Sequence, residues 1–494
     1  MTNKISCISI DLINADKPPA SLAFLAGVCE KVELPYQCIS LNSELVQSID
    51  INNYNTLYSK VKLNQFNDTL ELIYPVINQI LDEIEKFEST LVLVSVFSFL
   101  QYTLAEFFLK SLKQRNLGVE IIAGGPGIES EIDNKTIGKI FLDQGLINYY
   151  CLGEGDVVLP KFLKGDKIQL GLNCKKSLSE TWVPQIDDLD STYVLPSYKQ
   201  IKTQNYKNLE QKSSPIYSIS TSRGCVRKCS FCDVAKSWPK FRFRSGKLVA
   251  EEVLKHHLDV GAVNFTIVDS LINGSLKSFN DFNQSMINLK NQYPSLSEFS
   301  YNGMFIVRPK QQHDKKFFQS MKDAGCESLA IGVETGSDRL RFEMDKKFTN
   351  ADLDHHFEMC QKVGIQNVLL MFVAYPTETK DDFNQTLLML DRYQKYLIDN
   401  TILGINHTGI FTMIKGSPVY DFHDVHGIVV QDSVARPELQ WFNKNNPELD
   451  VKERTLRDII FRQKALELRY PIPYSERYLE YLQHINKEFI PISD

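Results

Sequence analysis

Short apolar runs alternate with helical patterns over about the first 160 residues, which is typical of a parallel sheet with crossover helices. Pro18 and Pro19 favour a helix start, and apolar residues repeat at helical spacing from Leu22 to Cys29. The short runs predict five strands, at residues 5–11, 36–41, 91–97, 119–123 and 147–152. Five strands of this kind predict a doubly wound, Rossmann-like parallel sheet over residues 1–162, so the fold class is α/β.

The apolar periodicity fades over residues 163–214, which are rich in polar residues and turn formers, so we interpret them as a linker. A second alternating series comes next, with helical patterns between its strands. These strands are predicted at residues 217–221, 264–269, 298–304, 328–333, 367–373 and 404–412. Six such units predict a partial (β/α)6 barrel over residues 215–413, with its chemistry at the carboxyl ends of the strands. Residues 414–494 have a helical and aromatic pattern that predicts a small cap.

Composition and charge narrow the class of protein. The chain has 494 residues, of which 43% are hydrophobic and 23% charged, as in a globular protein with a large core. Its net charge of −6 does not favour binding of nucleic acid or another polyanion. Acidic and proline residues precede any long apolar run at the N-terminus, so we expect no signal peptide, no membrane span and a cytoplasmic location.

The ten cysteines are unevenly distributed, because Cys225, Cys229 and Cys232 fall within eight residues. A structural zinc site needs four ligands, and so does a [4Fe-4S] cluster that is held by protein alone. Three thiolates leave one metal position open for a substrate or cofactor, so the spacing points to catalysis. The alternative is a zinc loop that takes a distant cysteine or histidine as its fourth ligand.

The motif C-x3-C-x2-C, with Phe231 before its last cysteine and a barrel strand before it, resembles that of the radical S-adenosylmethionine (SAM) enzymes. The resemblance implies that Cys225, Cys229 and Cys232 hold three irons of a [4Fe-4S] cluster while SAM chelates the fourth. It implies that one electron from the cluster cleaves the sulfonium and yields a 5′-deoxyadenosyl radical. A reductant such as flavodoxin or ferredoxin would then be a partner.

Other segments resemble the same family. FTIVDSLIN places Asp269 and Ser270 after the second barrel strand, where relatives contact the methionine moiety of SAM. IGVETGS places Glu334 at the end of the fourth strand, where relatives bind the ribose. For Asp269, the alternative is that an acid at the end of a strand is simply a polar residue of the barrel mouth. For Glu334, a charge directly after an apolar strand needs a partner, which favours a functional role.

Two further segments are less clear matches. Arg242 and Arg244 either pair with a carboxylate of the cofactor or are solvated, and we expect at least one to be solvated. Ala374 and Tyr375 stand where the family usually has glycine, which argues against close approach of adenine to the backbone there.

The N-terminal region resembles the cobalamin-binding domain that precedes many radical SAM barrels, through residues 17–27, 123–129 and 152–156. Glycines at a strand's carboxyl end let a ligand approach the backbone. The candidate contacts are Gly124, Gly125, Gly153, Glu154 and Gly155. No histidine precedes His256, so cobalamin would bind without a histidine ligand from this domain, between its sheet and the barrel mouth. A sheet that serves only as a scaffold is the alternative.

The leading hypothesis is therefore a cobalamin-dependent radical SAM enzyme that methylates an unactivated carbon. One alternative is a cobalamin-independent radical rearrangement, oxidation or cyclisation, and another is a non-catalytic iron–sulfur or zinc module that senses a ligand. The substrate is expected to be a small molecule or peptide, and net acidity argues weakly against a polyanion. His407 fits a core position and a substrate contact equally well. Four isolated cysteines have patterns of core positions and not of a second cluster: Cys7, Cys29, Cys38 and Cys151.

Overall fold

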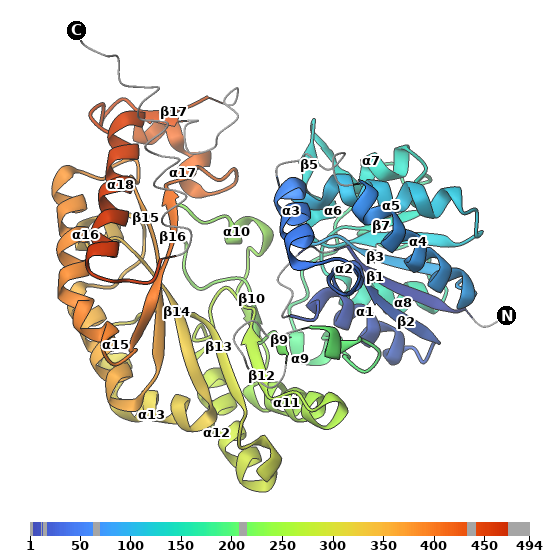
Figure 1. Ribbon diagram of the computed structural model, residues 1–494, viewed down its shortest axis with the longest axis horizontal. Helices are drawn as coiled ribbons and strands as arrows, with labels where there is room; N and C mark the ends of the chain where they lie inside the picture. The colour runs from blue at the N-terminus through green and yellow to red at the C-terminus, as the bar shows by residue number, and fades with distance from the viewer. Residues whose placement is uncertain are drawn as a thin grey trace. The chain divides into compact units, whose positions relative to one another are not determined.

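The computed structural model describes residues 3–10, 12, 17–62, 70–206, 215–431 and 441–472. The chain divides into two compact units (Figure 1). The first unit comprises Met1–Ile219 with Glu251–Phe265, and the second comprises Ser220–Ala250 with Thr266–Asp494. The domain limits predicted at residues 162, 214 and 413 stay predictions.

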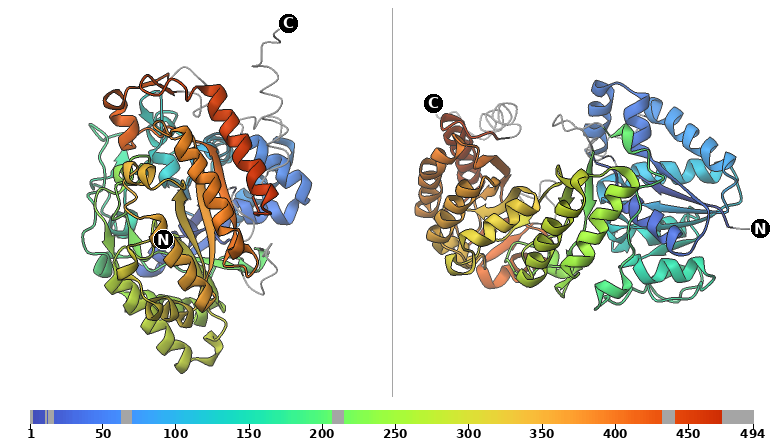
Figure 2. Two further views of the ribbon diagram at one scale, coloured as in Figure 1. Left: turned by 90° about the vertical axis from the view of Figure 1, so that its left-hand side faces the viewer. Right: turned by 90° about the horizontal axis from the view of Figure 1, so that it is seen from below.

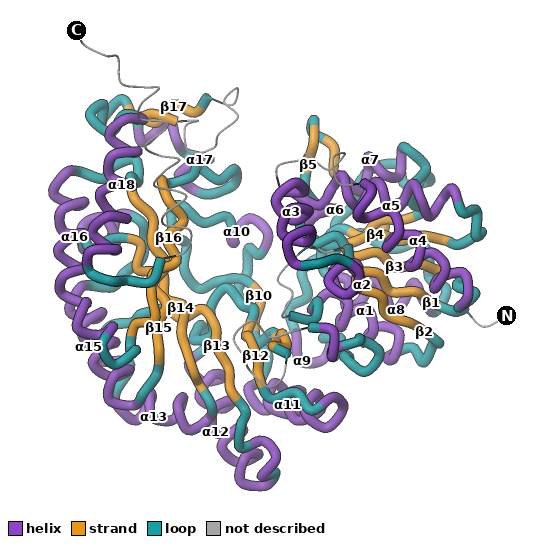
Figure 3. The backbone as a smooth tube through the Cα atoms, in the orientation of Figure 1, coloured by secondary structure: helices purple, strands orange, loops and turns teal. Residues whose placement is uncertain are grey.

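The sheet of the first unit has the strand order β2-β1-β3-β4-β7-β8. Its strands are β1 (Ile5–Ser9), β2 (Tyr36–Ser40), β3 (Leu91–Ser95), β4 (Glu120–Gly124), β7 (Tyr149–Cys151) and β8 (Leu172–Cys174). The first five are parallel and match the five predicted strands, while β8 pairs antiparallel with β7 at the edge. Figure 3 shows β1 to β4 of this sheet as neighbouring strands. Because the strand order reverses between β1 and β3, these two strands form the switch point of a doubly wound sheet.

Helices cover this sheet, and both faces of its central strands are buried. Every residue of β1 and β3 is buried, as parallel strands between two helical layers require. The helices are α1 (Ala20–Lys31), α2 (Leu41–Ser48), α3 (Ile51–Lys62), α4 (Leu70–Lys86), α5 (Tyr102–Gln114), α6 (Pro126–Glu129), α7 (Ile137–Asp143), α8 (Gly155–Leu163) and α9 (Leu189–Thr192). The predicted first helix is α1, which turns Leu22, Leu25 and Cys29 into the core.

A second sheet has the sequential strand order β16-β15-β14-β13-β12-β9. Its strands are β9 (Ile216–Ile219), β12 (Asn264–Ile267), β13 (Ser300–Phe305), β14 (Cys326–Glu334), β15 (Gln366–Val373) and β16 (Ile402–Ile410). All six predicted strands are present, and β13 to β16 pair in parallel. Since β9 and β16 are opposite ends of the strand order, the sheet stays open and is a partial barrel, as predicted.

Helices connect the strands of this open sheet and lie on one of its faces (Figure 2). They include α11 (Gly246–Val260), α12 (Leu276–Gln292), α13 (Lys315–Ala324), α14 (Asp338–Glu343), α15 (Asn350–Val363) and α16 (Lys380–Tyr393). Thr349 and Thr379 start α15 and α16 with capping boxes, and Gly364 ends α15 in the left-handed conformation. Local sequence signals therefore fix these helix ends.

The C-terminal segment forms α17 (Pro418–Asp421), the antiparallel pair β17 (Ile428–Val430) and β18 (Trp441–Asn443), and α18 (Val451–Glu467). Buried contacts hold α18 in place: Arg457 Nη1 lies 3.0 Å from Oε2 of Glu378 in the segment after β15, and Asp458 Oδ1 lies 2.5 Å from Nε2 of His407 in β16. His407 is thus a satisfied core residue. The aromatic residues predicted after residue 472 lie outside the described residues. Within the described ranges, the helices are too short or too polar to cross a membrane.

Candidate active site

The three clustered cysteines lie on one loop, residues 224–233, which we call the cysteine loop. It comes after β10 (Ser222–Arg223), which pairs antiparallel with β11 (Arg242–Phe243), and it precedes α10 (Val234–Ser237). Gly224 starts the loop with φ +86°, and a Cβ there would lie 2.7 Å from the carbonyl oxygen of Lys240. The turn therefore requires glycine, which explains the Arg-Gly-Cys sequence at its start.

The three thiols are partly buried and within electrostatic reach of one another. Burial raises the pKa of each thiol, to about 11 for Cys229, and the charge of Lys346 opposes this rise. The thiols also raise one another's pKa. Among the described residues, no three Cys, His, Asp or Glu side chains converge as they would on a single metal ion. A cubane cluster has a separate iron for each thiolate, so the donor set of Cys225, Cys229 and Cys232 fits a [4Fe-4S] cluster.

Lys346 is a cation within electrostatic reach of all three thiols, and the sequence did not single it out. Its Nζ lies 2.7 Å from Oε1 of Glu334 and 5.3 Å from the ring centroid of Phe231. Burial lowers the pKa of Lys346, but Glu334 and Cys229 outweigh it, so the net shift is upward. Gly332 makes room for the pair, because a Cβ there would lie 2.5 Å from both charged groups. The predicted need for a partner of Glu334 is thus met by Lys346.

Glu334 itself has an unusual backbone. It ends β14 with φ +63°, a conformation that favours glycine, and the β14–β15 register shifts between Gly332 and Glu334. The Glu334 residue is 7% exposed. Strained residues at strand ends are common where a side chain must point at a ligand. The predicted ribose contact stays a prediction.

Asp269 holds the base of the cysteine loop. Its buried carboxylate accepts hydrogen bonds from Ser220 Oγ (3.1 Å), the Thr221 backbone amide (2.9 Å), the Thr221 hydroxyl and Ser222 Oγ (2.9 Å). Burial raises the pKa of Asp269 to about 6, against the lowering effect of these donors. Ser270 is half-buried. The structure thus gives Asp269 a positioning role, while the predicted SAM contacts of Asp269 and Ser270 stay predictions.

The segments after β14, β15 and β16 hold the middle of the cysteine loop. Ser230 donates its amide to Met344 O (3.2 Å), shares a hydroxyl hydrogen bond with Tyr375 (2.8 Å) and accepts from the Val419 amide (2.7 Å). Phe231 packs edge-on against Phe372 at 5.4 Å between ring centroids. Tyr375, which stands where the family usually has glycine, therefore serves as a loop anchor.

Ala374 also departs from the family's glycine. It has φ +64°, and its amide donates to Glu378 Oε2 at 2.9 Å. The backbone thus keeps a conformation that suits glycine although an alanine occupies the position.

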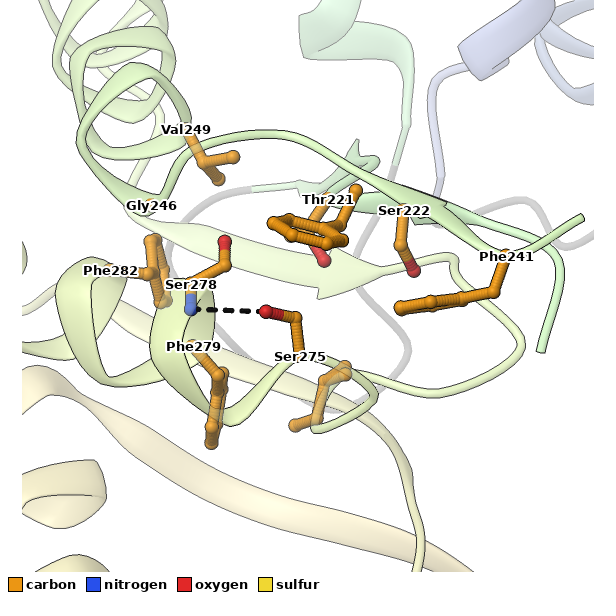
Figure 4. A pocket seen from close by; sticks show the side chains of 11 residues that line it. Thr221, Ser222, Phe241, Gly246, Val249, Ser275, Ser278, Phe279 and Phe282 are labelled. Atoms are coloured by element: carbon orange, nitrogen blue, oxygen red, sulfur yellow. Dashed lines mark hydrogen bonds between the residues drawn. The ribbon is translucent and has the colours of Figure 1, made fainter. Parts of the chain in front are cut away.

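Arg242 and Arg244 are both buried, so the expectation that at least one is solvated is wrong. The Arg242 guanidinium lies 5.4 Å from the Trp238 ring centroid, and Arg244 donates to Ser220 O at 2.9 Å. The segment 241–244 also packs against the start of α12, where Ser278 Oγ donates to the Arg244 carbonyl oxygen at 2.5 Å. A cavity of only about 10 Å³ remains there, with Ser278 donating its amide to Ser275 Oγ (Figure 4). This cavity is packing space and not a ligand site.

The glycines proposed to contact cobalamin lie at the carboxyl edge of the first sheet. Gly125 has φ +101°, and a Cβ there would lie 2.7 Å from Val96 O, so its turn requires glycine. Gly153 has φ +92° and donates its amide to Glu129 Oε1 at 2.8 Å. Around Gly124 there is more room, since the nearest atom to a Cβ is Cys151 Cβ at 3.8 Å.

Two further candidates of this edge have contacts inside the first unit. The buried carboxylate of Glu154 accepts from the Ile186 amide at 3.3 Å, and a Cβ on Gly155 would lie 3.2 Å from Leu159. A role of any of the five residues in cobalamin binding stays a prediction. The cysteines of this unit behave as predicted, because Cys7, Cys29, Cys38 and Cys151 are buried in its core.

Comparison with known proteins adds family and fold. Residues 219–390 match the model of the radical SAM superfamily. A curated relative in Methanocaldococcus jannaschii, named "Putative methylthiotransferase", is 28% identical over 258 residues, which are 50% of this chain and 54% of the relative. The chain thus spans about half the length of that relative.

Two solved structures share the fold over nearly the whole chain. The SAM methyltransferase TsrM from Kitasatospora setae, with cobalamin and a [4Fe-4S] cluster bound, has a TM-score of 0.62 at 13% identity and covers 99% of this chain and 100% of its own. OxsB, with aqua-cobalamin and SAM bound, has a TM-score of 0.65 at 14% identity, and the match covers 99% of this chain and 71% of OxsB. At this identity the likeness establishes the arrangement of elements.

Proposed function

Because this chain carries a radical SAM domain over residues 219–390, we propose that it is a cobalamin-dependent radical SAM methylase of an unactivated carbon in a small molecule or peptide. The observation that carries the proposal is the cysteine loop, which presents three partly buried thiols beside a partly buried lysine, Lys346. Three protein thiolates leave one iron of a [4Fe-4S] cluster open for SAM. When bound, the cluster would supply the electron that cleaves SAM.

The residues around the loop have distinct tasks in this proposal. Cys225, Cys229 and Cys232 would bind the irons as thiolates, so each gives up the proton that its raised pKa retains in the free protein. Lys346 stays protonated and offsets the negative charge that gathers there. Glu334 uses Oε1 for Lys346, and its other oxygen, which has no partner among the described residues, would accept from the SAM ribose.

Two observations support cobalamin as the second cofactor. The first unit is a doubly wound sheet whose order reverses at β1 and β3, and ligands of such sheets bind at the carboxyl ends beside the reversal. TsrM and OxsB, which share the fold over 99% of this chain, have each been solved with cobalamin bound. When bound, cobalamin would carry the methyl group. No histidine precedes His256, so we propose binding without a histidine ligand from residues 1–162.

Anaerobic reconstitution tests both cofactors in one preparation. The full chain is loaded with iron, sulfide and hydroxocobalamin, desalted, and incubated with SAM and a chemical reductant. We expect retained corrinoid absorbance and release of 5′-deoxyadenosine, with Cys229→Ser retaining the corrinoid but releasing no 5′-deoxyadenosine. Loss of corrinoid on desalting would reduce the proposal to cobalamin-independent radical chemistry, and wild-type protein without 5′-deoxyadenosine would refute the enzyme itself.

A further inference from the structure

A pocket of about 420 Å³ lies beside the cysteine loop, and its charged lining is entirely cationic. Its lining residues are Val226, Arg227, Gly274, Arg308, Pro309, Gln312 and Lys347. Arg227 belongs to the cysteine loop itself, and Arg308 lies just after β13. The pocket therefore adjoins the carboxyl end of the open sheet, where a barrel of this kind has its chemistry.

Neither arginine of the pocket has an acidic partner among the residues that the structure describes. Arg308 donates to the carbonyl oxygens of Asn273 (2.7 Å) and Gly274 (3.1 Å), but its buried Nε has no hydrogen-bond partner. Burial lowers the pKa of Arg308, and the like charge of Arg227 lowers it further. Within the described residues, no carboxylate forms an ion pair with either guanidinium. Lys347 differs, since it is exposed and lies 2.9 Å from Asp345.

Two guanidinium groups that face one pocket repel each other unless an anion neutralises them. The planar fork of guanidinium matches phosphate and carboxylate oxygens, which it binds with two parallel hydrogen bonds. We propose that Arg227 and Arg308 bind an oxyanion, a phosphate or carboxylate group, of the substrate. This inference rests on the proposed function, because it takes the adjoining cysteine loop as the reaction centre.

The charge of SAM argues against SAM as the occupant of this pocket. SAM carries an ammonium and a sulfonium against a single carboxylate, so a cationic pocket disfavours it. The acidity of the whole chain does not exclude an anionic substrate either, because the potential in a cleft depends on the residues that line it. The cationic pocket thus indicates an anionic group on the substrate, whereas the net charge of −6 taken alone argues against one.

Calorimetric titration of the reconstituted full chain with inorganic phosphate, pyrophosphate and succinate tests the site. We expect one of these anions to bind, and Arg227→Gln and Arg308→Gln to weaken its binding by about tenfold or more, as for lost charged hydrogen bonds. Tighter binding of phosphate or pyrophosphate would identify a phosphate group, and tighter binding of succinate a carboxylate. Arg227→Gln breaks no side-chain hydrogen bond that the structure shows, so it keeps the test valid if Arg308→Gln misfolds.

Lys228→Gln is the matched control, because Lys228 is an exposed neighbour on the same loop and does not line the pocket. It should change anion affinity less than about twofold, as expected for one exposed charge. The inference is overturned if none of the three anions binds, or if both arginine variants bind like wild type. Release of 5′-deoxyadenosine from SAM, measured on the same wild-type preparation, separates this failure from failure of the proposed function.

Discussion

The two parallel sheets of this chain differ in the residues at the carboxyl ends of their strands. In the first sheet, β1, β3 and β4 end at Ser9, Ser95 and Gly124, which are small and uncharged. In the open sheet, β12, β14 and β15 end at or near a buried acid; these acids are Asp269, Glu334 and Glu378. The first edge presents backbone and small side chains, and the second presents buried charge.

Each buried acid of the open sheet has partners that fix a neighbouring segment. Asp269 binds the base of the cysteine loop, Glu334 binds Lys346, and Glu378 lies 3.0 Å from Arg457 of α18. A buried charge that loses its partner is costly, so such pairs hold loops in one position. The acids at the carboxyl edge of the open sheet thus position neighbouring segments, while the corresponding strand ends of the first sheet carry small, uncharged residues.

Removing Lys346 should have the largest effect, because it leaves Glu334 buried without its partner. We expect Lys346→Met to lower the free energy of unfolding by about 3 kcal/mol, measured by urea denaturation of the cluster-free protein. Lys347→Met is the matched control, because Lys347 is exposed and pairs with the partly exposed Asp345. We expect this substitution to lower the free energy of unfolding by only about 0.5 kcal/mol. Equal effects of the two substitutions would contradict a scaffold role of the Glu334–Lys346 pair.

A substitution at Gly125 tests the uncharged edge of the first sheet. Gly125→Ala combines a left-handed backbone with a Cβ 2.7 Å from Val96 O, so we expect the free energy of unfolding to fall by about 2 kcal/mol. Gly118 has φ +71° with nothing within 4 Å of a Cβ, so Gly118→Ala should lose only about 1 kcal/mol. Thermal unfolding of both variants measures the difference, and a larger loss at Gly118 would show that close packing does not select the glycine.

Ala374 should give the smallest effect, of opposite sign. Ala374→Gly removes an alanine from a left-handed conformation at φ +64° and so relieves backbone strain. Glycine also raises the entropy of the unfolded chain, but we expect the relief of strain to be larger, so that the free energy of unfolding rises by about 0.5 kcal/mol. Ala330 lies within β14, where glycine should instead cost about 1 kcal/mol. Chemical denaturation should therefore move the two midpoints in opposite directions, and a loss of stability in Ala374→Gly would refute the strain.

The sequence predicted the strands and the cysteine loop because their signals are local. Buried runs such as LVLVS in β3, and cysteines at fixed spacing, need no knowledge of distant residues. Lys346 could not be assigned, since it stands next to Lys347 and only the fold brings it to Glu334. The edge strand β8 was missed because LNC carries little apolar signal and is held by pairing with β7. Arg242 and Arg244 were misjudged because the local pattern does not reveal the neighbours of their guanidinium groups, which are the Trp238 ring and the Ser220 carbonyl oxygen.

Electron paramagnetic resonance of the reconstituted and reduced full chain, before and after addition of SAM, tests the open iron site most directly. We expect a reduced [4Fe-4S] signal whose shape changes when SAM is added, because SAM takes the iron position that Cys225, Cys229 and Cys232 leave open. A cluster signal that SAM leaves unchanged would contradict that site.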